Sequence, residues 1–232
     1  MRQAGDEDND AVHGSGRPVG YITTTDQTES DPTGPREYRM KLTGSSTSPY
    51  VRRIRLLLAD VGQDYVFSDL NIYGADREAL KRRNPALKIP VLHDEEQTIY
   101  DSRVIFRYLQ HRLNLPALSW EQENLLTLID AVNDSWVTLL LAQRSGIDVN
   151  GDLTFFNLQH ERIATTLPVL ETQVLEGAFD SWTYPSICLY CMLDWGLFRE
   201  LLDMPDYPAL NRWHQNQGQQ PGIAQTDPRQ AS

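Results

Sequence analysis

The sequence predicts a chain in two parts, a mixed α/β unit followed by an all-helical domain. Three observations lead to this fold class. Short alternating segments bounded by turn residues occur only between residues 38 and 100. Stretches with apolar residues at helical spacing separate and follow them. After Pro116 the strand signals stop, and long apolar stripes of helical period take over.

The α/β unit is expected to alternate strands and helices. Its elements read as strand, helix, strand, helix, hairpin and helix, at residues 38–42, 50–61, 65–70, 76–83, 90–100 and 102–113. A right-handed crossover would pair the first two strands in parallel, and the hairpin would add an antiparallel edge. The result is a small mixed sheet.

The chain divides into four segments by composition and pattern. Residues 1–36 carry seven acidic and three basic side chains and almost nothing apolar, which predicts a disordered acidic leader. Residues 37–116 form the α/β unit, and residues 117–216 form the helical domain. Residues 217–232 are polar and rich in Pro and Gly, so we expect a C-terminal tail that lies extended on the surface or frays.

Charge and composition exclude several classes of function. The 21 basic and 32 acidic residues leave a net charge of −11, which disfavours binding to nucleic acid or to an anionic membrane. No stretch has the roughly 20 consecutive apolar residues of a membrane span, and the N-terminus resembles neither a secretory signal nor a transit peptide. A cytoplasmic protein is therefore expected.

A polar loop at residues 44–50 is the first candidate site. It lies between an expected strand and an expected helix, where hydroxyl groups, free backbone N–H groups and the positive end of the helix dipole meet. Such a loop can bind an anion. The structural alternative is that Ser48 caps the helix and Pro49 occupies its first position.

Two further segments carry candidate chemistry. Pro90 opens a strand, which suits an edge position, and by base rate the bond before it is trans. Asp101 and Ser102 place a carboxylate and a hydroxyl at another helix N-terminus, where they form a good cap.

Together, in this order, these segments resemble the glutathione S-transferase family. The resemblance covers roughly residues 38–228 and rests on five motifs. They are Ser-Pro-Tyr-Val-Arg-Arg-Ile-Arg at 48–55, in the serine form of tau-class and many bacterial members, Asn-Pro…Lys-Ile-Pro-Val-Leu at 84–92, Asp-Ser-Arg-Val-Ile at 101–105, Cys-Met-Leu-Asp-Trp at 191–195, and Tyr-Pro-Ala-Leu-Asn-Arg-Trp at 207–213.

The resemblance implies a thioredoxin-like N-terminal domain that binds glutathione, followed by the family's all-helical C-terminal domain. It implies a cis bond before Pro90, with the backbone of Ile89 pairing with the peptide like an added strand. Asp101 would bind the γ-glutamyl ammonium, Ser102 the adjacent carboxylate, and Lys88 the glycyl end. Tyr50 is counted with the glutathione-binding residues.

Ser48 is the expected catalytic residue. Its hydroxyl and the helix N-terminus would favour the glutathione thiolate by on the order of 1–2 kcal/mol, about one pKa unit. Ser46 and Thr47 are alternative hydroxyl groups. Because Ser occupies position 48, mixed-disulfide chemistry on a protein thiol is disfavoured.

The expected function is a detoxifying glutathione transferase that adds the thiolate to a small electrophile, as a homodimer by family resemblance. Trp136, Leu140 and Arg144 are candidates for the electrophile site, although the first two could equally belong to the core. Peroxide reduction and dehalogenation share the activated thiol and stay open. A non-catalytic member that binds glutathione or an apolar ligand, or acts as a scaffold, is the alternative function.

Other features favour structural roles. Cys188 and Cys191 are expected to pack in a helical core rather than to bind zinc or to undergo redox chemistry. The five histidines show no ligand spacing, so no metal is expected. Ser186 stands where the family has a capping aspartate, which predicts a weaker cap. Asp194 and Trp195 are expected to pack and to form a hydrogen bond.

Overall fold

A four-stranded mixed sheet forms the base of the structure. The computed structural model describes residues 40–230, so the acidic leader expected at 1–36 lies outside the described residues. The sheet has the order β2-β1-β3-β4. Its strands are β1 (Lys41–Gly44), β2 (Val66–Asp69), β3 (Val91–Asp94) and β4 (Gln97–Tyr100). β1 pairs with β2 in parallel, and both β1 with β3 and β3 with β4 pair antiparallel, which confirms the predicted mixed sheet.

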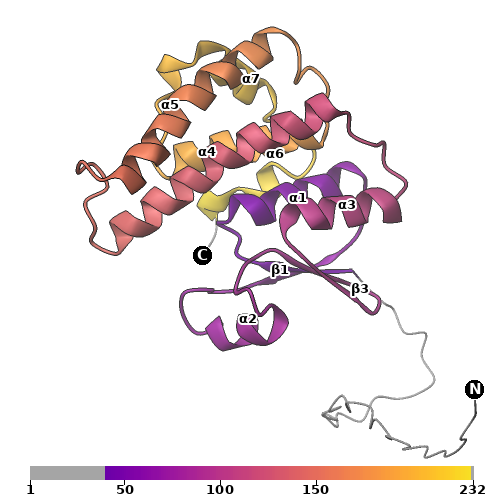
Figure 1. Cartoon of the computed structure of the whole chain (residues 1–232). Helices are drawn as coiled ribbons and strands as arrows, with labels where there is room; N and C mark the ends of the chain where they lie inside the picture. Colours follow the sequence, from indigo (N-terminus) through magenta and orange to yellow (C-terminus); the bar gives the residue numbers. More distant parts are fainter. Residues whose placement is uncertain (1–39, 231–232) are drawn as a thin grey trace, which may run out of the picture. The chain divides into compact units, whose positions relative to one another are not determined.

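Three helices accompany this sheet. α1 (Pro49–Asp60) and α3 (Ser102–Arg112) lie on the face toward the helical part, whereas α2 (Arg77–Arg83) lies on the other face (Figure 1). α1 buries Val51, Ile54, Leu57 and Leu58, the apolar positions that the sequence spaced at one helical face. The first strand ends at Gly44, two residues later than expected.

Four helices build the second half, as predicted. They are α4 (Trp120–Arg144), α5 (Thr154–Leu175), α6 (Tyr184–Phe198) and α7 (Pro208–Asn216). α4 begins with a capping box, in which Ser119 and Gln122 each bind the other's backbone N–H. By length and composition alone α4 could cross a membrane, but here it packs against α5 and α6.

Helix α6 is the central element of the helical half, because nearly every residue from Tyr184 to Gly196 is buried. This part of α6 therefore presents no face to solvent. The N-cap residue Thr183 makes no side-chain capping bond, and the Ser186 hydroxyl instead donates to the carbonyl of Ser181 at 2.7 Å. The weaker cap expected from the sequence is therefore present.

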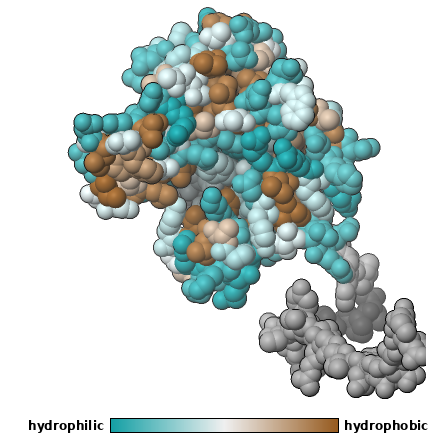
Figure 2. All heavy atoms as spheres, viewed as in Figure 1, coloured by the Kyte–Doolittle hydropathy of each residue, from teal (hydrophilic) through white to brown (hydrophobic). Residues whose placement is uncertain are grey.

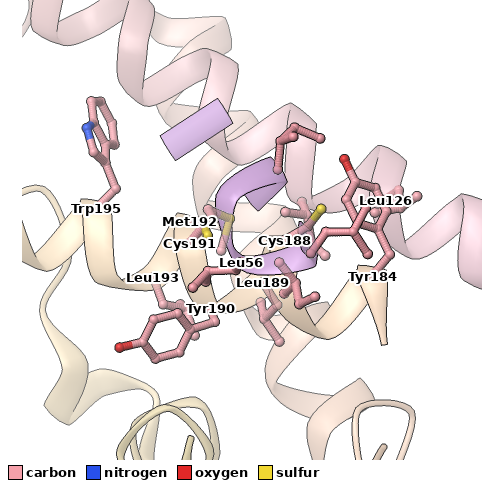
Figure 3. Packing of buried hydrophobic residues seen from close by; sticks show 14 of the residues in the cluster. Leu56, Leu126, Tyr184, Cys188, Leu189, Tyr190, Cys191, Met192, Leu193 and Trp195 are labelled. Atoms are coloured by element: carbon pink, nitrogen blue, oxygen red, sulfur yellow. The ribbon is translucent and has the colours of Figure 1, made fainter. Parts of the chain in front are cut away.

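Cys188 and Cys191 lie in this core as free thiols, which confirms their predicted packing role (Figure 3). Burial raises the pKa of each thiol to about 12, despite the opposing positive charges of the α1 arginines. Both thiols are therefore protonated and unreactive near neutral pH.

The C-terminal segment corrects our expectation of an extended or fraying tail. After α7 the chain forms two short 3₁₀ helices, η2 (Ala224–Thr226) and η3 (Pro228–Gln230), and it packs back on α1. Ile223 is only 7% exposed, and its carbonyl accepts a hydrogen bond from the Arg52 guanidinium at 3.2 Å. The polar composition suggested exposure, but polar groups of this segment are used inside the protein. The backbone carbonyl of Ile223 and the hydroxyl of Thr226 accept hydrogen bonds from the buried guanidinium of Arg52.

We predict that Ile223→Ala lowers the free energy of unfolding by about 2–5 kcal/mol, because it leaves a cavity against α1. Urea denaturation followed by circular dichroism measures this change. Gln219→Ala, at an exposed position in the same segment, is the control and should have no effect. Equal stability of the two variants would contradict the packing of this segment.

Candidate functional site

The three candidate segments meet at one end of the sheet. In the register, Thr43 of β1 pairs with Val91 of β3, and Val91 pairs with Tyr100 of β4. The loop after β1, the residues before β3 and the residues after β4 therefore leave the sheet side by side. Strand pairing brings together residues that lie up to about fifty positions apart in the chain.

Ser48 sits at the N-terminus of α1 as its N-cap. Its backbone is extended, and its hydroxyl oxygen accepts a 3.4 Å hydrogen bond from the N–H of Val51. Pro49 follows at the first helical position. Because Ser48 Oγ accepts in this contact, its hydrogen remains able to donate to a group at the positive end of the helix. The capping role and a binding role are thus compatible.

The neighbouring hydroxyl groups are less well placed. Ser45 Oγ and Thr47 Oγ1 lie 3.2 Å apart and bind each other. Ser46 is fixed through its backbone N–H, which donates to the Asp69 carboxylate at 2.9 Å. Of the hydroxyl groups in this loop, only that of Ser48 caps α1.

The peptide bond between Ile89 and Pro90 is cis. This agrees with the family resemblance and corrects the trans bond expected from base rates. Asn84 holds the preceding loop, because its amide donates to the Lys88 carbonyl at 2.8 Å and its oxygen accepts from the Ala86 N–H at 2.9 Å. Among residues 40–230, the backbone of Ile89 has no backbone hydrogen-bond partner, and Lys88 is exposed beside it.

Asp101 and Ser102 open helix α3. Asp101 is exposed, has a φ of 70°, and accepts a hydrogen bond from the Arg103 N–H at 2.9 Å. Ser102 is buried, and its carbonyl accepts a 3.1 Å bond from the hydroxyl of Tyr184 in α6. The Tyr184 ring stacks on Phe106 of α3 at 3.8 Å. The helical half thus supports this corner of the site.

A buried ionic network lies behind the α1 N-terminus. Arg52 is 3% exposed and binds Asp194 of α6, and its Nε donates to Thr226 Oγ1 at 3.1 Å. Asp194 also binds Arg229 at 3.0 Å and lies 3.3 Å from His214 Nε2. Burial by itself would raise the pKa of Asp194, but His214, Arg52 and Arg229 outweigh it and lower that pKa well below its usual range.

The side chain of Tyr50 points toward the helical half and is hydrogen-bonded there. Its hydroxyl donates to Asp134 of α4, and burial together with this carboxylate raises the pKa of Tyr50. The guanidinium of Arg53 lies 5.0 Å from the ring centre. Arg53 is fully buried and binds Asp130 of α4 at 2.7 Å. A contact of Tyr50 with glutathione would therefore involve its ring or backbone.

The three residues proposed for the electrophile site occupy different environments. Trp136 is 2% exposed and packs on Gly196, so its side chain belongs to the core. Leu140 is partly buried against the same core. Only Arg144, the last residue of α4, is exposed. Within residues 40–230, no group of His, Cys, Asp or Glu is arranged to hold a metal ion.

The comparison with known proteins agrees with this geometry. Residues 42–117 match the family model described as glutathione S-transferase, N-terminal domain. The structure is also similar to a crystal structure of a glutathione S-transferase from Methylobacillus flagellatus with a TM-score of 0.72, at 26% identity over 82% of this chain and 99% of that chain. The chain belongs to the glutathione S-transferase family. Its sheet unit is the thioredoxin-like domain of that family.

Relatives of this transferase-family chain come from bacteria and plants. It is 28% identical to the uncharacterized GST-like protein YibF of Escherichia coli, over 83% of this chain and all of that protein. It is also 28% identical to glutathione S-transferase U18 of Arabidopsis thaliana, over 75% of this chain and 83% of the relative. A glutathione transferase family member from Pseudomonas fluorescens, solved with bound glutathione, is 29% identical, covers 82% and 98% of the two chains and has a TM-score of 0.69.

Sequence reasoning missed several residues that position the site. It predicted a hydrogen bond for Trp195 without naming the partner. In the structure the indole N–H of Trp195 donates to the Thr47 carbonyl at 3.1 Å. It did not predict the partners of Arg52 or the support from Tyr184. One signal was present: Arg52 and Arg53 lie between the apolar residues Val51 and Ile54, and burial of either arginine would require a carboxylate partner.

We predict that Asp194→Asn lowers the free energy of unfolding by about 3–5 kcal/mol at neutral pH, because it leaves Arg52 buried without its counterion. The pKa of Asp194 is lower in the native state than its value of about 3.9 in the unfolded chain, so the ionised carboxylate stabilises the native state at pH values above about 3.9. This stabilisation is lost progressively as the pH falls below that value. Denaturant titrations between pH 2 and 7 should thus show a smaller acid-induced loss in the variant.

Asp203→Asn provides the matched control, because Asp203 is exposed and forms no ion pair among the described residues. The control should keep the stability and acid dependence of the wild type. An Asp194→Asn variant with the same behaviour would contradict the role of this network.

Proposed function

We propose that this chain is a glutathione transferase in which Ser48 stabilises the thiolate of bound glutathione for attack on a small electrophile. One observation carries the proposal. The Ser48 hydroxyl at the α1 N-terminus lies at the same end of the sheet as the exposed carboxylate of Asp101 and the backbone of Ile89, which has no backbone partner among residues 40–230.

The chemistry requires a thiol that ionises near neutral pH. A free cysteine thiol has a pKa near 8.5 and is mostly protonated at pH 7. A hydrogen bond from Ser48 and the α1 dipole together favour the thiolate by about 1–2 kcal/mol. This lowers the thiol pKa by about one unit. Ser48 acts as a donor and not as a nucleophile, because neither the loop nor α1 offers it a histidine base.

The remaining residues match the parts of a zwitterionic tripeptide. The N–H and C=O of Ile89 pair with its cysteinyl backbone, as an added strand would. Asp101 binds the γ-glutamyl ammonium, and the α3 N-terminus at Ser102 holds the neighbouring carboxylate. Lys88 approaches the glycyl carboxylate. These contacts are local, so the acidic character of the whole chain does not oppose them.

Relatives support this assignment. The Pseudomonas and Methylobacillus structures hold bound glutathione, and a second structure of the Pseudomonas protein, 25% identical with a TM-score of 0.66, holds S-(propanoic acid)-glutathione. We further propose that the chain forms a homodimer, on the basis of family resemblance, and that it acts in the cytoplasm. Size-exclusion chromatography with light scattering measures the subunit number.

We predict that Ser48→Ala lowers turnover of a chromogenic chloronitrobenzene at least tenfold, because the thiolate loses its hydrogen-bond donor. Ser46→Ala, in the same loop, is the control and should lose less than twofold. Stopped-flow mixing with glutathione should show the ultraviolet thiolate band with wild type and a weaker band with Ser48→Ala. Glutathione binding without any thiolate band in the wild type would favour a non-catalytic binding protein.

We predict that Asp101→Asn weakens glutathione binding about tenfold to a hundredfold, because a charge-assisted hydrogen bond contributes about 1.5–3 kcal/mol. Calorimetry with glutathione and with its analogue lacking the γ-glutamyl amino group separates this contact from others. The analogue should bind wild type and variant equally. An equal loss for both ligands would show that Asp101 supports the loop and does not bind the ammonium.

A further inference from the structure

A polar cavity lies at the β2 edge of the sheet, beside the loop that carries Ser48. It has a volume of about 240 Å³. Its wall is built by the loop after β1, the middle of α1, strand β2 and the C-terminal segment. The lining residues are Ser46, Arg55, Phe67, Asp69, Gln225, Asp227 and Gln230.

This cavity is separate from the proposed glutathione site. The sheet has the order β2-β1-β3-β4, and the cavity borders β2. The glutathione residues Ile89 and Asp101 instead flank β3 and β4. Strand β1 and the loop after it therefore lie between the two places. A ligand in the cavity contacts this loop at Ser46, from the side opposite to glutathione.

Arg55 presents a fixed guanidinium to the cavity. The group lies 4.3 Å from the centre of the Phe67 ring. Its Nε donates to the Tyr65 hydroxyl at 3.4 Å, and its Nη2 donates to the Gln225 carbonyl at 3.3 Å. Within the described part of the chain, Nη1 has no hydrogen-bond partner, and no carboxylate lies within 4.0 Å of the group. Arg55 is thus a preorganised cation with a free donor.

Asp69 presents the opposite charge to the same cavity. It is the last residue of β2, and its Oδ1 accepts the Ser46 N–H at 2.9 Å. Among residues 40–230, its Oδ2 has no hydrogen-bond partner and no cation lies within 4.0 Å of the carboxylate. The other carboxylate of the wall, Asp227, is neutralised by Arg229 at 3.0 Å. The wall therefore carries one uncompensated cation and one uncompensated anion.

Arg55 and Asp69 do not neutralise each other, although they line one cavity. Their charged atoms are more than 4.0 Å apart, because they form no ion pair. Each group is held in place by other contacts, the guanidinium by Phe67 and Gln225 and the carboxylate by Ser46. A molecule that carries both a carboxylate and an ammonium group complements this arrangement, whereas a singly charged molecule satisfies only one side.

The cavity suits a small polar ligand. Gln225 and Gln230 add side-chain amides to its wall, and Ser46 adds a hydroxyl. Exposed hydrophobic side chains gather elsewhere, on the lobe where α4 ends and α5 begins (Figure 2). The volume of about 240 Å³ is below the roughly 300–1,000 Å³ of pockets for drug-sized molecules. The cavity therefore matches a molecule of amino-acid size.

We propose that this cavity is a binding site for a free α-amino acid with a polar side chain. The amino-acid carboxylate binds the free Nη1 of Arg55, and the ammonium group binds Oδ2 of Asp69. The side chain of the ligand meets the amides of Gln225 and Gln230. Asp69 also holds the N–H of Ser46, so the bound amino acid touches the loop that leads to Ser48. The inference goes beyond the proposed function and does not depend on it.

L-Asparagine and two derivatives test the pattern of charges. N-Acetyl-L-asparagine keeps the carboxylate but lacks the ammonium group, and L-asparagine amide keeps the ammonium group but lacks the carboxylate. Binding to the isotope-labelled full chain is followed by nuclear magnetic resonance titration. We predict that each derivative binds at least tenfold more weakly than L-asparagine, because each loses a charge-assisted hydrogen bond. Equal affinities of the three compounds, or no binding of L-asparagine, would overturn the inference.

The same titration locates the ligand. The backbone amide signals of Ser46 and Asp69 should shift with L-asparagine, because both residues line the cavity. The signals of Ile89 and Ser102 should stay in place, since these residues lie beyond β1 at the proposed glutathione site. Shifts confined to Ile89 and Ser102 would rule out the cavity as the binding site.

We predict that Asp69→Asn and Arg55→Gln each weaken L-asparagine binding at least tenfold. The first variant removes the charge but keeps an oxygen that can accept the Ser46 N–H, so it tests the site even if Arg55→Gln proves unstable. Asp64→Asn is the matched control, because Asp64 is exposed and does not line the cavity. Its affinity should equal that of the wild type. An Asp69→Asn variant with wild-type affinity would contradict the inference.

Saturation with S-hexylglutathione distinguishes the cavity from the proposed glutathione site. L-Asparagine should bind the free protein and this complex with affinities that agree within twofold. Displacement of L-asparagine by S-hexylglutathione would place the amino acid in the glutathione site and overturn the inference, while the proposed function stands. Failure of S-hexylglutathione to bind would count against the proposed function, and the titrations of the free protein would still decide the cavity.

Discussion

Helix α1 carries two buried guanidinium groups, and their compensation by carboxylates of the helical half is the constraint on which the site depends. Arg52 binds Asp194 of α6, and Arg53 binds Asp130 of α4. A buried cation without a partner costs several kcal/mol, so α1 is stable in this position only when α4 and α6 are packed against it. The loop that carries Ser48 leads directly into α1, so the position of α1 sets the position of Ser48.

Further hydrogen bonds extend this dependence to each corner of the site. Trp195 holds the carbonyl of Thr47, and Tyr184 holds the carbonyl of Ser102. The C-terminal segment completes the environment of Arg52 through Ile223 and Thr226. The sheet unit thus supplies the groups that meet glutathione in the proposed mechanism, whereas the helical half and the C-terminal segment fix where those groups lie.

Net charge and local charge differ in this protein. The chain carries −11 in total, yet α1 and the C-terminal segment place Arg52, Arg53 and Arg229 close behind the site loop. Some of these, such as Arg52 and Arg229, are neutralised by Asp194 and serve the structure. At physiological ionic strength, salt screens the long-range repulsion of anions beyond about 8 Å, whereas it screens contact pairs much less.

The sequence alone determined what depends on local chemistry. Helical and alternating periods predicted the order of elements, Ser48 and Pro49 predicted the start of α1, and the apolar context of Cys188 and Cys191 predicted their burial. The motifs also pointed to the family and, through it, to the cis bond before Pro90, which the residues by themselves would have made trans. Local patterns succeed here because each is set by neighbours within a few positions.

The tertiary structure decided what depends on partners far away in the chain. Arg52 and Asp194 are 142 positions apart in the chain, and Thr47 and Trp195 are 148 apart, so neither contact has a local signal in the sequence. The same holds for the C-terminal segment, whose polar composition suggests exposure until a buried cation is found beneath it. Whether a charge is buried depends on which distant carboxylate packs against it, so only the tertiary structure decides it.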